Sequence, residues 1–126
     1  MPSYSSSMLR SDHFVPESAT DPVAQRKLRG QLESIDYTAF ASNREVIGHV
    51  LGHADSALFK RMAVACAAAR ARWVKEAMTI TAESPTPGPE KIQKLAELRH
   101  AFEELSSAYE ATRRLVERGY LPFRAD

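Results

Sequence analysis

Residues 56–118 decide the fold of this chain, and they read SALFKRMAVACAAARARWVKEAMTITAESPTPGPEKIQKLAELRHAFEELSSAYEATRRLVER. Two segments without proline or glycine flank a break at 84–89, which contains three prolines and one glycine. Proline cannot donate a backbone hydrogen bond, and it disfavours the helical conformation in the residue before it. The pattern predicts one helix over about 56–83 and a second over about 90–118. A connector this short favours an antiparallel hairpin.

The first of these helices carries two apolar stripes. The main stripe recurs every three or four residues, as on one helical face, and comprises Phe59, Met62, Cys66, Ala69, Trp73, Ala77 and Ile80. A second strip comprises Ala63, Ala67, Val74 and Met78. Small side chains crowd residues 63–71, and they let another helix approach closely. The helix therefore has more apolar surface than one neighbouring helix covers.

The second helix has a heptad pattern over about three repeats. Its apolar seam alternates spacings of three and four and comprises Leu95, Leu98, Phe102, Leu105, Tyr109, Thr112 and Val116. Gly119 is suited to the position just after a helix, because glycine accepts a positive φ angle. The apolar residues 120–123 follow as a short hook beyond the predicted helix.

The N-terminal third is expected to contain a loose arm and two short helices. Residues 1–20 are rich in serine and lack a helical or strand period, so they are expected to form a flexible arm. Asp21 and Pro22 suit a helix start, and the apolar spacing predicts a helix over about 22–35. Tyr37 and Phe40 are expected in a connector. Ser42 or Asn43 is expected to cap a short helix over about 44–51.

These features predict an all-α fold with a single helical domain over 21–126. The two short helices cannot cover two helices of about 40 Å. A second copy of the chain can cover the remaining apolar surface, because a two-fold interface buries the same patch twice. We therefore expect a homodimer with a four-helix core. Its seam is expected at Phe59, Met62, Cys66, Ala69 and Trp73.

Composition excludes several classes of protein. Seventeen Lys and Arg residues against sixteen Asp and Glu residues give a formal net charge of +1, which lacks the basic excess of a general nucleic-acid binder. The single cysteine cannot form an intrachain disulfide. No apolar run reaches the roughly 20 residues of a membrane helix, and no secretory signal is recognisable. A cytoplasmic protein without a membrane partner is expected, and abundant Ala and Arg are typical of a GC-rich bacterial genome.

The sequence contains no recognisable catalytic or metal-binding motif. His49 and His53 are spaced as on one helical face, but no third ligand follows at a metal-site spacing. No glycine-rich phosphate loop or nucleophile elbow is present. Cys66 belongs to an alanine-rich seam, where a thiol is expected to be inert. We therefore expect no enzymatic activity, no cofactor and no metal.

Residues 44–65 allow an alternative function as a dimeric DNA-binding regulator. Their pattern of helix, glycine-containing turn and helix is similar to a helix-turn-helix. Residues 46–83 contain five basic and three acidic side chains, so phosphate contacts are possible. However, a 28-residue recognition helix is unusually long, and its start has few groups that read base edges.

The leading expectation is a non-enzymatic, homodimeric module that binds another protein. Small bacterial regulators that sequester or adapt a partner, such as antiactivators and secretion chaperones, use comparable helical scaffolds, an analogy of architecture alone. Exposed apolar side chains with arginines at the rim would form the contact. The predicted contact residues are Phe14, Tyr37, Phe40, Val74, Met78, Tyr120, Leu121 and Phe123.

Overall fold

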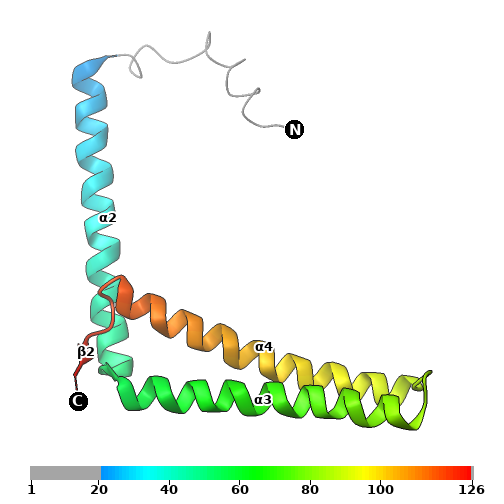
Figure 1. The fold of residues 1–126 in the computed structure, drawn as a ribbon. Helices are drawn as coiled ribbons and strands as arrows, with labels where there is room; N and C mark the ends of the chain where they lie inside the picture. Colours follow the sequence, from blue (N-terminus) through cyan, green and yellow to red (C-terminus); the bar gives the residue numbers. More distant parts are fainter. Residues whose placement is uncertain (1–20, 126) are drawn as a thin grey trace. The chain divides into compact units, whose positions relative to one another are not determined.

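The structure is a computed structural model, and it describes residues 21–125 (Figure 1). Within these residues the helices are α2 (Pro22–Leu51), α3 (Ser56–Glu83) and α4 (Pro89–Glu117). Two short strands, β1 (Ala54–Asp55) and β2 (Phe123–Arg124), form a parallel pair. The predicted all-α class is confirmed, with this strand pair as a minor addition. The predicted arm over 1–20, including Phe14, lies outside the described residues.

Residues 22–51 form one continuous helix, so the prediction of two short N-terminal helices was wrong. Tyr37 and Phe40 are helical residues of α2, not parts of a connector. No proline or glycine occurs over 36–43, so nothing interrupts the i to i−4 backbone hydrogen bonds. Ser42 and Asn43 are good capping residues, but a cap ends a helix only where the chain leaves the helical path. The helix starts as expected, because the Asp21 carboxylate accepts the Val23 N–H at 3.0 Å.

α3 and α4 run side by side in opposite directions after the short connector at 84–88 (Figure 1). The Trp73 and Phe102 rings stack with their centroids 5.9 Å apart, and the Phe59 and Tyr109 rings form a T-shaped pair with centroids 5.8 Å apart. The Asp55 carboxylate caps α3 by accepting the Leu58 N–H at 2.9 Å. Pro89 occupies the first turn of α4, where its missing N–H leaves no bond unmade.

The connector between α3 and α4 is reinforced by charge. Lys91 near the start of α4 donates a hydrogen bond to the Glu83 carboxylate at the end of α3. This hydrogen bond, and then the negative charge of Glu83, raise the pKa of Lys91 above its ordinary value. Further from the connector, Lys94 Nζ of α4 lies 3.6 Å from Glu76 Oε1 of α3. Such exposed pairs contribute little stability each, but they favour this register of the two helices.

The chain end folds back onto the turn between α2 and α3. Gly119 has a φ of 77°, which lets the chain reverse after α4. The N–H groups of Tyr120 and Leu121 then both donate to the Leu115 carbonyl, at 2.9 and 3.1 Å. Ala54 N–H donates to the Pro122 carbonyl at 2.8 Å, and Ala54 is in register with Phe123. The hook is therefore held to the end of α4 by two hydrogen bonds and to the segment before α3 by the β1–β2 pairing.

Few side chains are fully buried among residues 21–125. The four buried residues are Ala54, Ala69, Ile80 and Leu121, each at most 3% exposed. Every member of the main α3 stripe is buried or half-buried, as are all seam positions of α4 except Leu105. Leu105 remains 37% exposed. The heptad pattern therefore identifies the inner faces of both helices.

The chain divides into two units, Met1–Ser42 and Asn43–Asp126. In the first unit the described part is the α2 segment up to Ser42. The second contains the end of α2, the α3–α4 pair and both strands. Over the described residues, no helix combines the length and apolarity that crossing a bilayer requires.

Candidate protein-binding site

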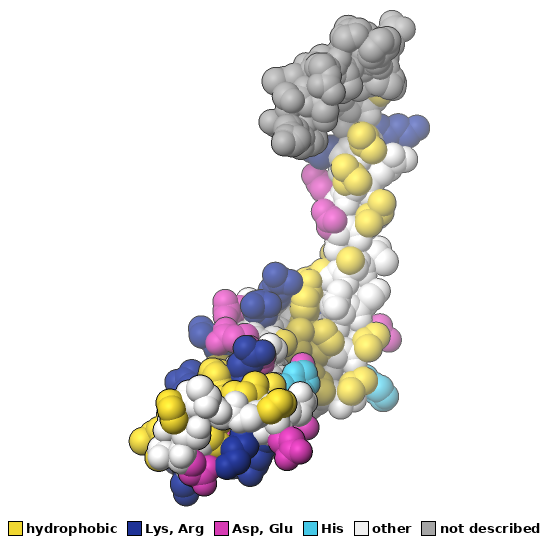
Figure 2. Space-filling view, turned by 90° about the vertical axis from the view of Figure 1, so that its right-hand side faces the viewer, with side chains coloured by type: hydrophobic (Ala, Val, Ile, Leu, Met, Phe, Trp, Pro, Cys, Tyr) yellow, Lys and Arg dark blue, Asp and Glu magenta, His cyan; other side chains and the backbone are white. Residues whose placement is uncertain are grey.

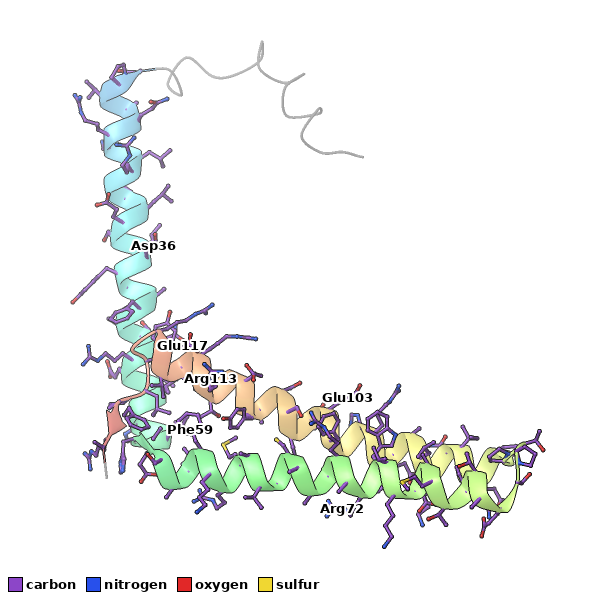
Figure 3. The ribbon with its side chains drawn as sticks, viewed as in Figure 1. Asp36, Phe59, Arg72, Glu103, Arg113 and Glu117 are labelled. Carbon is purple, nitrogen blue, oxygen red and sulfur yellow. The ribbon has the colours of Figure 1, made fainter. Side chains whose placement is uncertain are left out.

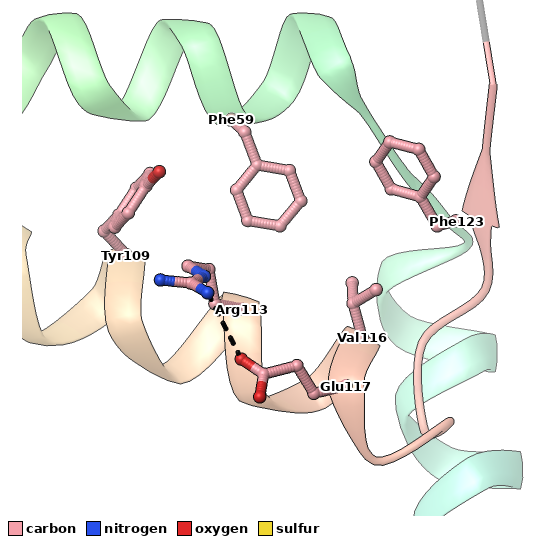
Figure 4. Close-up of a pocket in the computed structure, with 6 residues that line it drawn as sticks. All are labelled: Phe59, Tyr109, Arg113, Val116, Glu117 and Phe123. Atoms are coloured by element: carbon pink, nitrogen blue, oxygen red, sulfur yellow. Dashed lines mark ion pairs between the residues drawn. The ribbon is translucent and has the colours of Figure 1, made fainter.

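An open cleft lies between the start of α3 and the end of α4, next to β2 (Figure 4). It has a volume of about 360 Å³ and is lined by Phe59, Tyr109, Arg113, Val116, Glu117 and Phe123. Phe59 projects from α3 between Tyr109 and Phe123 (Figure 4). The Phe59 and Phe123 rings are 6.3 Å apart at a tilt of 38°. The interior of the cleft is therefore mainly aromatic and aliphatic.

Local structure explains how these rings meet. Phe59 lies in the first turn and a half of α3, whose start is held by the Asp55 cap. Tyr109 and Val116 belong to the inner face of α4. The pairing of β1 with β2 places Phe123 in register with Ala54, next to the start of α3. Phe123 keeps 47% of its surface exposed, so a ligand can reach it.

An ion pair lies at the edge of the cleft. Arg113 Nη2 is 3.7 Å from Glu117 Oε1, one helical turn along α4 (Figure 4). Both side chains are more than half exposed, so the pair is worth only about 0.3–0.5 kcal/mol. A binding partner can therefore form its own ion pair with Arg113 or Glu117, because breaking the existing pair costs little free energy. The cleft thus combines an apolar interior with one cationic and one anionic group at its edge.

A second cleft, of about 410 Å³, lies along part of residues 44–65, the segment whose pattern is similar to a helix-turn-helix. It is lined by Leu51, His53, Asp55, Leu58, Arg61, Met62, Thr112 and Leu121. His53 Nε2 lies 3.9 Å from Asp55 Oδ2. Over residues 21–125, no group of three His, Cys, Asp or Glu side chains is close enough to hold a metal ion. The basic residues Lys60 and Arg61 are exposed on α3.

A third, smaller cleft lies near the other end of the α3–α4 pair. It has a volume of about 300 Å³ and is lined by Trp73, Ile92, Leu95, Ala96 and Arg99. Outside this inner face the helices carry charge: Arg72 points away from α4, and Glu103 points away from α3 (Figure 3). Glu103 Oε1 lies 3.9 Å from Arg99 Nε on the same helix.

Within the second unit, the structure does not bring the predicted contact residues together. Phe123 lines the aromatic cleft, and Tyr120, three residues earlier in the chain, is half-buried. Val74 and Met78 are 46% and 68% exposed on α3, but Val74 is fifteen residues, or about 22 Å of helix, beyond Phe59. Tyr37, 72% exposed, and the half-buried Phe40 belong to α2 in the other unit.

Leu121 was predicted as an exposed contact residue, but only 2% of its surface is exposed. Its N–H is bonded to the Leu115 carbonyl, which turns the chain inward after α4. Its side chain is one of those lining the second cleft, among residues of α2, α3 and α4. The hook at 120–123 therefore contains a buried structural residue, Leu121, and an accessible aromatic residue, Phe123.

The residues predicted as a dimer seam face α4 of the same chain. Phe59 and Trp73 make ring contacts with Tyr109 and Phe102. Ala69 is buried, and Met62 and the free thiol of Cys66 are half-buried. The seam is thus used within the chain, and it leaves mainly the outer faces of α3 and α4 exposed.

Sequence reasoning missed the cleft residues Arg113 and Glu117, and it took Tyr109 and Val116 only as seam positions. The sequence feature that indicated the cleft was the apolar hook after Gly119, because such a hook packs against the nearest apolar surface. A two-residue strand pairing has no sequence pattern of its own. No protein-family model, curated protein or solved structure matches this chain at a significant level.

Proposed function

We propose that this chain is a non-enzymatic, homodimeric helical module that binds another protein. The observation that carries this proposal is the ratio of exposed to buried apolar side chains. Among residues 21–125, fourteen large hydrophobic side chains are exposed, whereas four hydrophobic residues are buried. Single exposed apolar residues are normal, but extended apolar surfaces on helices are typical of interaction sites.

The exposed side chains provide a driving force for association. Complete burial of a Val, Leu, Ile or Met side chain contributes about 1.5–3 kcal/mol. Val23, Ile35 and Met78 are each more than 60% exposed. A partner that covers several such residues gains enough free energy to offset the entropy lost on binding. This favours a module that is completed by other chains.

The aromatic cleft is the proposed site for the partner protein. Aromatic residues and arginine dominate the energetics of protein interfaces, and the cleft supplies both through Phe59, Tyr109, Phe123 and Arg113. An apolar side chain of an amphipathic partner segment would enter between the rings. Arg113 and Glu117 would then bond to polar groups flanking that side chain. Such a mode suits a small regulator that sequesters or adapts a partner, as antiactivators and chaperones do.

The lining of the cleft supports binding rather than catalysis. Its one carboxylate, Glu117, and its one cation, Arg113, interact with each other at 3.7 Å. General acid–base chemistry instead needs a group aimed at the reacting atoms in a position that excludes water. The open, apolar geometry here offers shape and hydrophobic contact, which suit recognition of a side chain.

Affinity capture from native cell extract tests this proposal with two matched variants. Phe123→Ala removes the accessible ring of the cleft, whereas Val64→Ala trims a 60% exposed residue of α3 outside it. We expect the protein recovered with wild type to bind Phe123→Ala at least tenfold more weakly and Val64→Ala normally. Circular dichroism should show an unchanged helix content in both. Equal binding by wild type and Phe123→Ala would remove the cleft from the proposal.

A further inference from the structure

The N-terminal half of α2 exposes an apolar stripe within the first unit. Leu28, Leu32 and Ile35 are 54%, 50% and 61% exposed. Their spacings of four and three place them on one face of the helix. Figure 2 shows hydrophobic side chains exposed along this helix.

This face of α2 is free of charged residues. With about 100° between successive residues, no Asp, Glu, Lys or Arg over 22–42 lies within about 60° of the centre of the stripe. Arg29 and Asp36 lie just beyond it, along the same edge. An uncharged apolar face with charges along its edge is typical of a helix that pairs with another helix.

The two edge charges are self-complementary in one orientation only. Arg29 and Asp36 are seven residues apart, which is about 10.5 Å along the helix axis. When two copies of α2 pair antiparallel about a two-fold axis near Leu32, each Arg29 is level with Asp36 of the second copy. In a parallel, in-register pair, Arg29 would be level with Arg29 and Asp36 with Asp36. Among the described residues, no ion pair holds either side chain.

We propose that two copies of this chain associate through an antiparallel pairing of α2. The stripe of Leu28, Leu32 and Ile35 forms the contact, and Arg29 pairs with Asp36 of the second copy at both ends. The inference rests on the self-association part of the proposed function and assigns it a surface. It moves the dimer interface away from the inner face of α3, which α4 of the same chain already covers.

A charge exchange tests the orientation on the full-length chain. Arg29→Asp or Asp36→Arg alone places like charges opposite each other twice per dimer, so we expect a five- to tenfold weaker association of each variant. A 1:1 mixture of the two variants places opposite charges together at both contacts. Heterodimers should therefore form with nearly wild-type affinity. Sedimentation equilibrium with a fluorescent label on one variant measures homodimers and heterodimers separately.

Matched controls lie on the opposite face of the same helix. Arg26→Asp and Glu33→Arg make the same charge changes at positions about 135–155° from the centre of the stripe, so we expect them to leave association unchanged. Leu32→Asp should reduce association more than either edge variant, because it places a charge in the contact. Circular dichroism should show that all variants keep their helix content.

The outcomes separate this inference from the proposed function. A wild-type dimer that Arg29→Asp and Arg26→Asp weaken equally, or not at all, overturns pairing through α2 but leaves self-association intact. Edge variants that weaken the dimer without recovery in the mixture overturn the antiparallel orientation. A wild-type chain that stays monomeric at every concentration overturns both the inference and the homodimer proposal.

Discussion

Gly52 and Gly30 show that the same residue type has opposite roles in this chain. Gly52 ends α2 with a φ of 79°, in the left-handed region that residues with a Cβ atom rarely adopt. Gly30 lies inside α2, where its backbone freedom only weakens the helix. A Cβ atom added at either position would meet nothing within 4 Å. Any effect of alanine therefore comes from the backbone and not from a clash.

We therefore predict opposite effects for two alanine substitutions. Gly52→Ala should destabilise the turn before α3 by about 1–2 kcal/mol, and Gly30→Ala should stabilise α2 by about 0.5–1 kcal/mol. Amide hydrogen exchange should show faster exchange around residue 52 and slower exchange around residue 30. Faster exchange at both positions would contradict the helical assignment of Gly30.

At the scale of the elements, α3 and α4 depend on a few large rings rather than on a continuous core. Phe102 of α4 stacks on Trp73, and the Arg70 guanidinium carbon lies 4.8 Å from the centre of the Phe102 ring. The alanines near Cys66 add little area of their own. Removing one ring should therefore cost much more than removing an exposed aliphatic side chain beside it.

Trp73→Ala and Val74→Ala test this difference on adjacent residues. Trp73→Ala should reduce the free energy of unfolding by about 2–3 kcal/mol, below the full range for a buried aromatic because Trp73 is only half-buried. Val74 is 46% exposed, so Val74→Ala should reduce the free energy of unfolding by less than about 0.5 kcal/mol. Urea unfolding followed by circular dichroism measures both values. Similar losses for the two variants would mean that α3 packs through a different face.

At the scale of the whole molecule, fourteen large hydrophobic side chains of the described residues are exposed. Of the described residues, only four are buried, and none of these belongs to α2. Residues 22–42 of α2 are exposed at all but three positions, so this segment gains little from tertiary packing, on which most helices in proteins depend. Association of two copies would supply that packing, so stability should depend on protein concentration.

We predict that the thermal midpoint of the wild-type chain rises with protein concentration. Binding to the folded state stabilises it by mass action, by about 2.7 kcal/mol at a hundredfold excess over the dissociation constant. Arg29→Asp should flatten this dependence, whereas Arg26→Asp should not. Calorimetry over a hundredfold concentration range provides the measurement. A midpoint that is independent of concentration for wild type would argue against a dimer that contributes to stability.

The structure places several sequence-derived features where they were expected and moves others. α3 spans the predicted 56–83, and Gly119 follows α4 with the positive φ angle expected of it. The two predicted helices of the N-terminal third are one helix, because Ser42 and Asn43 have cap-forming side chains but no helix breaker beside them. Leu121 was expected to be an exposed contact residue, but the turn after α4 buries it.

By itself, the sequence determined the all-α class, the break at 84–89 and the inner faces of α3 and α4. These features depend on backbone hydrogen bonds, breakers and apolar spacing within a few residues of each other. Only the tertiary structure decided that β2 joins β1 and that Phe123 meets Phe59 beside Tyr109. Those contacts join residues that are far apart in the sequence. They can form, and stabilise the fold, only when the helices have packed together. The aromatic cleft is therefore a property of the fold and not of any one segment.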